Sequence, residues 1–101
     1  MQMKVKDFDK GLKRKHFVHL RIKKNPHYFF YLEYPIDSGE IHTSINTWRG
    51  DHSDEGYLSD NRIKDSADEL HFERKKDFEE FLACRFSYED YISLLKGKNL
   101  L

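Results

Sequence analysis

The stretch that decides the fold class is residues 17–34, which read FVHLRIKKNPHYFFYLEY. Aliphatic residues alternate with polar ones over its first part, which predicts a half-buried strand whose aliphatic side faces the core. Asn25 and Pro26 then predict a turn. The aromatic run from His27 to Tyr34 predicts a central strand, because aromatic side chains favour extended backbone. The residues expected to face inward from the first strand are Val18, Leu20 and Ile22.

The flanking residues extend this pattern into a three-stranded sheet that follows a helix. Residues 41–48 alternate again, with Ile45 on the aliphatic side, and predict a third strand. Residues 4–15 place apolar side chains at the spacing of one helix face. The sequence therefore predicts a short amphipathic helix and then an antiparallel meander. The apolar face of the helix consists of Val5, Phe8 and Leu12.

Helical spacing of apolar residues returns in the second half of the chain. One helix is predicted within residues 56–70, with either Ser53 or Ser59 as its N-cap. A second helical segment is predicted over residues 72–82, and residues 87–90 resemble a capping box that opens a last helix. The predicted class is α+β: an α-β-β-β-α core whose three-stranded antiparallel sheet is covered on one face by helices, with one or two extra C-terminal helices.

The length and composition fit one small domain. The chain has 101 residues, of which 38% are hydrophobic and 36% are charged. We expect residues 1–71 to form the α-β-β-β-α core and residues 72–101 a C-terminal helical extension. A single cysteine excludes an intramolecular disulfide, and no apolar run approaches the ~20 residues of a membrane span. The N-terminus lacks the apolar stretch of a secretory signal, so we expect a cytoplasmic protein.

Positive charge is concentrated near the N-terminus although the formal net charge is zero. Residues 1–24 contain nine Lys or Arg and two Asp, a net charge of +7, which leaves −7 for the rest of the chain. A basic segment of this kind is typical of a surface that binds a polyanion such as RNA. The alternative is a solvated helix and edge strand whose lysines keep the fold soluble.

Cleavage of a phosphodiester is the chemistry that the candidate site residues support best. His27 lies beside the predicted turn, where its imidazole is a candidate general acid or base. Either His42 or His52 would supply the second proton-transfer group, and Arg21 would help to hold the phosphate. The cations predicted to bind nucleic acid are Lys13, Arg14, Lys15, Arg21, Lys23 and Lys24.

Two further features of the sequence concern base stacking and metal binding. Tyr28, Phe29 and Tyr31 either stack on unpaired bases or fill the core. The chain has six histidines but no His-Glu-x-x-His or Cys-x-x-Cys spacing, so no metal site and no cofactor is predicted.

Several segments between residues 4 and 96 resemble the HicA-like toxin family. In that family a helix leads to Gly-Phe, a strand and then Gly-Ser-His followed by aromatic or apolar residues. The matching segments here are 12–17 (LKRKHF), 25–30 (NPHYFF), 41–52 (IHTSINTWRGDH), 84–87 (CRFS) and 91–95 (YISLL).

The resemblance implies a double-stranded-RNA-binding-domain fold and a metal-independent, mRNA-cleaving toxin that pairs with a HicB-type antitoxin. The family's catalytic histidine corresponds to His27. Asn25 and Pro26 replace the Gly-Ser that precedes it, which removes a backbone N–H from the turn. Two hypotheses follow: an RNA-binding protein that cleaves RNA through His27, or a non-catalytic nucleic-acid- or protein-binding module, such as a phage or mobile-element inhibitor.

Overall fold

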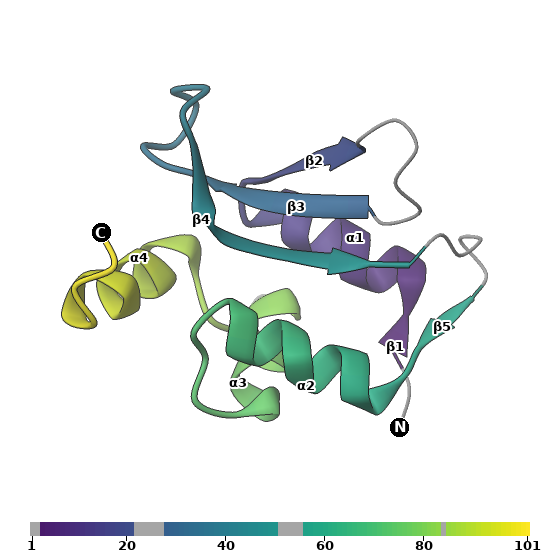
Figure 1. Ribbon diagram of the computed structural model, residues 1–101. Helices are drawn as coiled ribbons and strands as arrows, with labels where there is room; N and C mark the ends of the chain where they lie inside the picture. Colours follow the sequence, from purple (N-terminus) through teal and green to yellow (C-terminus); the bar gives the residue numbers. More distant parts are fainter. Residues whose placement is uncertain (1–2, 22–27, 51–55, 84) are drawn as a thin grey trace.

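The predicted meander forms the central sheet of the molecule (Figure 1). In this computed structural model, β2 (Phe17–Arg21), β3 (Tyr28–Glu33) and β4 (Ile41–Arg49) pair antiparallel, with β3 in the middle. The structure describes residues 3–21, 28–50, 56–83 and 85–101, and the side chain of Arg21 is outside this description. The α+β class and the order of helix, three strands and further helices are confirmed.

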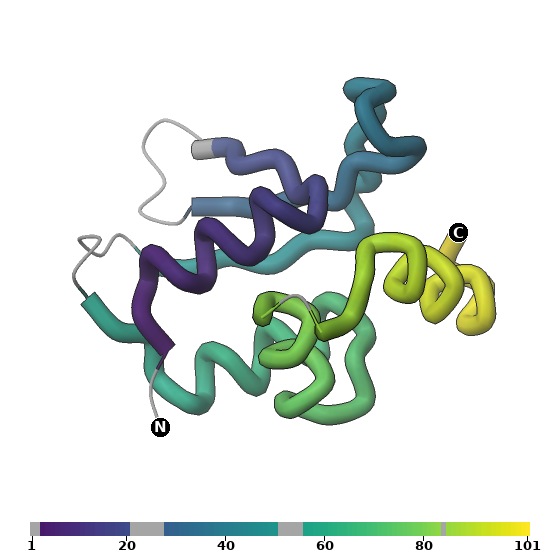
Figure 2. Tube along the Cα trace, turned by 180° about the vertical axis from the view of Figure 1, so that it is seen from behind, coloured from purple at the N-terminus to yellow at the C-terminus, as the bar shows by residue number. Residues whose placement is uncertain are grey.

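Helices cover one face of this sheet. Helix α1 (Val5–Arg14) lies behind the sheet in Figure 1 and in front of it in Figure 2. Helix α2 (Asp60–Glu69) packs against β4, and α3 (Lys75–Leu82) packs against both α1 and α2. The ring of Phe8 in α1 is fully buried, with its centroid 5.7 Å from that of Phe30 in β3 and 6.1 Å from that of Phe78 in α3. The predicted apolar face of α1 is therefore the face that meets the sheet.

The last helix, α4 (Tyr88–Gly97), is anchored to the same hydrophobic core. Tyr91 is fully buried, and its ring stacks on Phe72 with centroids 5.1 Å apart and packs against Phe81 at 4.8 Å. Its hydroxyl donates to the carbonyl oxygen of Leu70 at 2.8 Å. Burial raises the pKa of this hydroxyl, so it stays protonated and remains a donor.

The inward face of β2 differs from the sequence-based expectation. Phe17 is opposite the buried Leu32 and is itself buried, whereas Leu20 is 41% exposed. Val18 and Leu20 therefore lie on the open face of the sheet, and the prediction that they face the core is wrong. The alternation of β2 was right but its phase was inverted, because the larger ring of Phe17 occupies the core next to Phe81 and successive side chains of a strand point to opposite faces. Ile45 of β4 is buried as predicted.

The helix N-termini follow the capping signals in the sequence. Ser59 is the N-cap of α2, and its Oγ accepts a hydrogen bond from the backbone N–H of Arg62 at 3.1 Å. The predicted capping box is confirmed at α4, where Ser87 Oγ accepts from the Asp90 N–H at 3.0 Å and the Asp90 carboxylate accepts from the Ser87 N–H. Within the described residues, each helix is too short or too polar to span a lipid bilayer.

A second, two-stranded sheet was not predicted. Strands β1 (Met3–Lys4) and β5 (Tyr57–Leu58) pair antiparallel, and the backbone N–H of Val5 donates to the carbonyl oxygen of Gly56 at 3.0 Å. Two residues are too few to show a strand periodicity, so only the tertiary contact reveals this pair. It fixes the start of α1 beside the start of α2.

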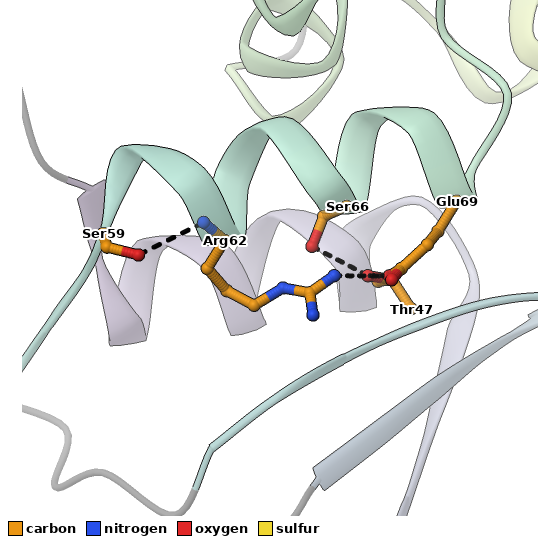
Figure 3. A network of polar contacts seen from close by, with 5 residues as sticks. All are labelled: Thr47, Ser59, Arg62, Ser66 and Glu69. Carbon is orange, nitrogen blue, oxygen red and sulfur yellow. Dashed lines mark hydrogen bonds and ion pairs between the residues drawn. The ribbon is translucent and has the colours of Figure 1, made fainter.

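A buried polar network joins β4 to α2 (Figure 3). Thr47 and Ser66 are both fully buried, and their hydroxyls are hydrogen-bonded at 2.8 Å. Thr47 Oγ1 also donates to Glu69 Oε1 at 2.7 Å, and the same carboxylate oxygen accepts from Arg62. The Arg62 guanidinium lies over the ring of Trp48, 3.9 Å from its centroid. Since Thr47 and Ser66 have no contact with solvent, we assign this network to the docking of α2 on the sheet.

Candidate nucleic-acid interface

The exposed side of α1 carries four cations, which we call the α1 cation row. Because the apolar residues of the helix occupy one face, its cations lie on the opposite, exposed side. Together with Asp9, the cations line a shallow groove along the helix. The α1 cation row consists of Lys6, Lys10, Lys13 and Arg14, which are all exposed.

The charge of Asp9, beside this row, is neutralised from within the protein. Arg49 at the end of β4 donates from Nε to Asp9 Oδ1 and from Nη2 to Asp9 Oδ2, both at 2.7 Å. Arg49 is buried, and its guanidinium also lies over the ring of Tyr28, 4.3 Å from the centroid. A bidentate pair of this kind fixes both partners. Asp9 is therefore held by β4, and positive charge dominates the solvent side of α1.

Of the three predicted cations at the end of α1, Lys15 differs from the other two. Lys13 and Arg14 are exposed, and Arg14 Nη2 donates to the carbonyl oxygen of Leu82 at 3.4 Å. Lys15 is only 7% exposed, and its ammonium group lies over the ring of Phe81, 5.4 Å from the centroid. Lys15 therefore holds the turn after α1 onto α3 and does not present its charge to a ligand at the surface.

The end of β2 brings Arg21 toward the N-terminal half of α1. The arrowhead of β2 and the start of α1 lie at the same end of the molecule in both views (Figure 1, Figure 2). The chain reverses direction in the short turn between α1 and β2, so β2 runs antiparallel to α1. The last residue of β2 therefore lies beside the first turns of the helix. The predicted site residues that follow lie outside the described residues. They are Lys23, Lys24, His27 and His52.

His42 is at the opposite end of the sheet from Arg21. In the register of the sheet Arg21 is opposite Tyr28 at the start of β3, whereas His42 is opposite Leu32 near its end. His42 Nε2 is also hydrogen-bonded to the carbonyl oxygen of Tyr34 at 3.1 Å. His42 is one of the two histidines predicted to assist His27. It lies away from the Arg21 end of the sheet, and its ring nitrogen is hydrogen-bonded within the β3–β4 hairpin.

The aromatic residues of β3 divide between the two faces of the sheet. Phe30 belongs to the core, and Tyr28 lies under the Arg49 guanidinium on the same face. Phe29 and Tyr31 lie on the open face, where their rings stack with centroids 6.2 Å apart and an angle of 23° between their planes. Both are half-buried. For Tyr28 the structure thus favours packing inside the protein, whereas Phe29 and Tyr31 lie on the side that α1 does not cover.

A further polar cluster, which sequence reasoning missed, lies at the His42 end of the sheet. One imidazole nitrogen of His16 and one carboxylate oxygen each of Glu33 and Asp37 lie within 4.8 Å of one another. We call these residues the 16/33/37 cluster. They come from the α1–β2 turn, the end of β3 and the β3–β4 loop, so no spacing in the sequence indicates the cluster.

Neighbouring groups hold two side chains of the 16/33/37 cluster, those of Glu33 and His16, in place. Glu33 Oε1 accepts from the backbone N–H of Asp37 and Glu33 Oε2 from that of Gly39, both at 3.1 Å. The ring of His16 packs edge-on against Tyr88, with centroids 5.1 Å apart. Tyr88 donates to the carbonyl oxygen of Glu33 at 2.7 Å. Burial, assisted by the neighbouring Tyr34 and Glu33, raises the pKa of Tyr88 to about 12, so its hydroxyl remains a donor at neutral pH.

Comparison with known proteins provides no relative for this chain. No protein-family model matches it, and no match is found among curated proteins or solved structures.

Proposed function

We propose that this protein binds RNA, with the α1 cation row as its electrostatic contact surface. The observation that carries the proposal is the placement of Lys6, Lys10, Lys13 and Arg14 on one exposed side of α1, with Asp9 neutralised by Arg49. A row of lysine and arginine on one helix face is suited to the repeated charges of a phosphate backbone. The order of α1, three strands and α2 supports the HicA-like interpretation of the sequence.

Within this proposal the protein is a metal-independent endoribonuclease in which His27 transfers protons. A general base removes the proton from a ribose 2′-OH, and the 2′-oxygen attacks the adjacent phosphorus. The bond from phosphorus to the 5′-oxygen breaks, and a general acid protonates the leaving oxygen. The products are a 2′,3′-cyclic phosphate and a 5′-hydroxyl. Neighbouring cations such as Arg21 stabilise the charge on the phosphorane oxygens.

The partners that follow from this proposal are RNA and a HicB-type antitoxin, and the compartment is the cytoplasm, where mRNA is translated. The −7 charge of residues 25–101 gives the molecule an acidic part that a basic protein surface can contact without competing for the α1 cation row. RNA and a protein partner can therefore use different surfaces.

Cleavage of a long single-stranded RNA in the presence of EDTA tests the catalytic part of the proposal. We expect wild-type protein to produce fragments that end in cyclic phosphate, and His27→Ala to lower the rate by about 10²- to 10⁴-fold, the usual contribution of general acid–base catalysis. The matched control is His71→Asn, which removes an imidazole far along the chain at a residue with φ of 71°, a conformation that Asn tolerates.

The outcomes separate the hypotheses. Equal rates for wild type and His27→Ala would exclude His27, and loss of cleavage in His71→Asn as well would indicate a general effect on the fold. If the proteins bind RNA in a salt-sensitive manner but none of them cleaves it, the RNA-binding proposal stands and the ribonuclease proposal is excluded.

The second candidate is a non-catalytic module that binds a protein through the open face of the sheet. Leu20 is 41% exposed there, and Val18, Phe29 and Tyr31 lie on the same face. This candidate predicts neither RNA cleavage nor salt-dependent RNA binding. It is the interpretation to adopt if both assays are negative.

A further inference from the structure

We propose that the 16/33/37 cluster is a binding site for a divalent transition metal of the Zn²⁺ class. The cluster offers one imidazole nitrogen and two carboxylate oxygens, all within 4.8 Å of one another. Imidazole and carboxylate are both ordinary zinc ligands, and three protein ligands leave a position for water. The site is distinct from the proposed ribonuclease function and does not depend on it.

The geometry needs only a small adjustment to bind an ion. Zinc lies about 2.0–2.2 Å from nitrogen and oxygen ligands, so two ligand atoms of one ion are at most about 4.4 Å apart. The cluster atoms lie within 4.8 Å of one another, which side-chain rotation can close. His16 and Glu33 are half-buried and Asp37 is exposed, so an ion can enter from solvent.

The charges at the cluster favour a cation. No ion pair joins Glu33 or Asp37 to a Lys or Arg within the part of the chain that the structure describes. The nearby Lys96 ammonium lies over the Tyr34 ring, 5.6 Å from its centroid. Two carboxylates this close repel each other, and a divalent ion between them removes that repulsion.

The supporting contacts resemble those that orient metal ligands. Backbone N–H groups of Asp37 and Gly39 hold the two Glu33 oxygens, and the Glu33 N–H donates to the carbonyl oxygen of His16 at 3.0 Å. The Tyr88 ring fixes one side of the His16 imidazole. Interactions of this kind set the direction of metal ligands and contribute to affinity. The Glu33 carboxylate and the His16 imidazole are thus oriented before the ion arrives, and the exposed Asp37 side chain can rotate to complete the set.

The imidazole nitrogen selects the class of ion. Mg²⁺ and Ca²⁺ prefer a full set of oxygen ligands, whereas imidazole suits zinc and its neighbours in the first transition row. A bound ion would link the α1–β2 turn to the β3–β4 hairpin. This is the opposite end of the sheet from Arg21 and Tyr28, and about 17 Å of strand β3 separates the two ends at ~3.3 Å per residue. Metal removal is therefore expected to act on the α1–β2 turn, next to Lys13 and Arg14, and not on the Arg21 end of the sheet.

Calorimetric titration of ZnCl₂ into EDTA-treated, dialysed protein tests the site. We expect one equivalent of Zn²⁺ to bind with a Kd in the micromolar range or below, and Tm to rise by about 10–20 °C at a hundredfold excess over Kd. MgCl₂ at the same concentration should give no such shift. His16→Asn and Asp37→Asn should each weaken Zn²⁺ binding at least about 100-fold, because loss of a ligand costs more than loss of a supporting contact.

The variants are chosen so that the backbone is preserved. His16 and Asp37 have φ of 61° and 59°, and Asn adopts this left-handed conformation more readily than most residues. His71→Asn, at φ of 71°, is the matched control and should bind Zn²⁺ as wild type does. Circular dichroism of the metal-free proteins checks their folding. The proposal would be overturned if wild type bound no Zn²⁺ at 100-micromolar concentrations, which correspond to a binding free energy of about −5.5 kcal/mol. It would also be overturned if both cluster variants kept wild-type affinity.

Discussion

Gly11 is the residue that allows α1 and α3 to approach closely. A Cβ atom built on Gly11 would lie 2.9 Å from Leu82 Cδ2 and 3.1 Å from the Leu82 carbonyl oxygen. The carbonyl belongs to the backbone of α3, so rotation of the Leu82 side chain relieves only part of the overlap. The helical spacing of the sequence does not reveal this requirement. By helix propensity alone, position 11 would favour a residue larger than glycine.

We therefore expect Gly11→Ala to lower the free energy of unfolding by about 1–3 kcal/mol, the usual cost of overpacking. Gly97→Ala is the control, because a Cβ there would have no atom within 4 Å apart from its chain neighbours and the adjoining backbone of α4. That change should be neutral or stabilising, since Ala is the better helix former. Urea denaturation of both variants measures the difference, and equal stabilities would contradict the close-approach argument.

Arg49 illustrates a residue whose role depends on a distant partner. It follows an alternating strand and gives no sign in the sequence that it will be buried. In the structure it is 4% exposed and pairs with Asp9 across 40 positions of the chain. The pair neutralises one of the two negative charges of α1, which leaves the α1 cation row more strongly positive.

At the scale of elements, the network around Thr47 determines how α2 docks on β4. Thr47→Val keeps the shape of the side chain but removes the hydroxyl that donates to Glu69 and is hydrogen-bonded to Ser66. We expect the free energy of unfolding to fall by about 1–3 kcal/mol, because buried polar groups are left without a partner.

Thr43→Val on the same strand is the matched control for Thr47→Val. Thr43 is exposed, so its change should stay within about 0.5 kcal/mol of wild type. Urea denaturation with an unchanged m-value would assign both effects to the folded state. A similar loss in the two variants would mean that the network contributes nothing beyond strand propensity.

For strand β2 the sequence predicts the alternation of side chains but not which face is buried. Its period of two was predicted from the alternation that begins at Val18, and the aliphatic residues of that alternation were expected to face the core. The structure buries Phe17 beside Phe81 and Tyr91, and this contact with the C-terminal helices reverses the phase. A strand read without its partners has two equivalent faces.

At the scale of the whole molecule, charge is divided between the basic N-terminal segment and the acidic remainder. RNA binding through the α1 cation row should therefore depend on individual cations of that row and not on lysines elsewhere. We expect Lys13→Ala to weaken RNA binding and to lower the slope of log K against log salt by about one unit, as for the loss of one phosphate contact.

Lys64→Ala is the control for this prediction. Lys64 is also exposed but belongs to α2, in the acidic part of the chain, so its removal should leave the affinity and the salt slope unchanged. Filter binding or fluorescence anisotropy over a series of KCl concentrations measures both quantities. Equal losses in the two variants would indicate non-specific attraction and not a surface on α1.

The sequence by itself determined the order of α1, the three strands of the central sheet and the later helices, the capping box at Ser87, and the basic character of α1. These properties are local, because the spacing of apolar residues, cap chemistry and charge involve neighbours in the chain. Tertiary structure decided the inward face of β2, the burial of Lys15 under α3, and the 16/33/37 cluster. Each of these depends on atoms from segments far apart in the sequence, and their meeting is set by how the helices pack on the sheet.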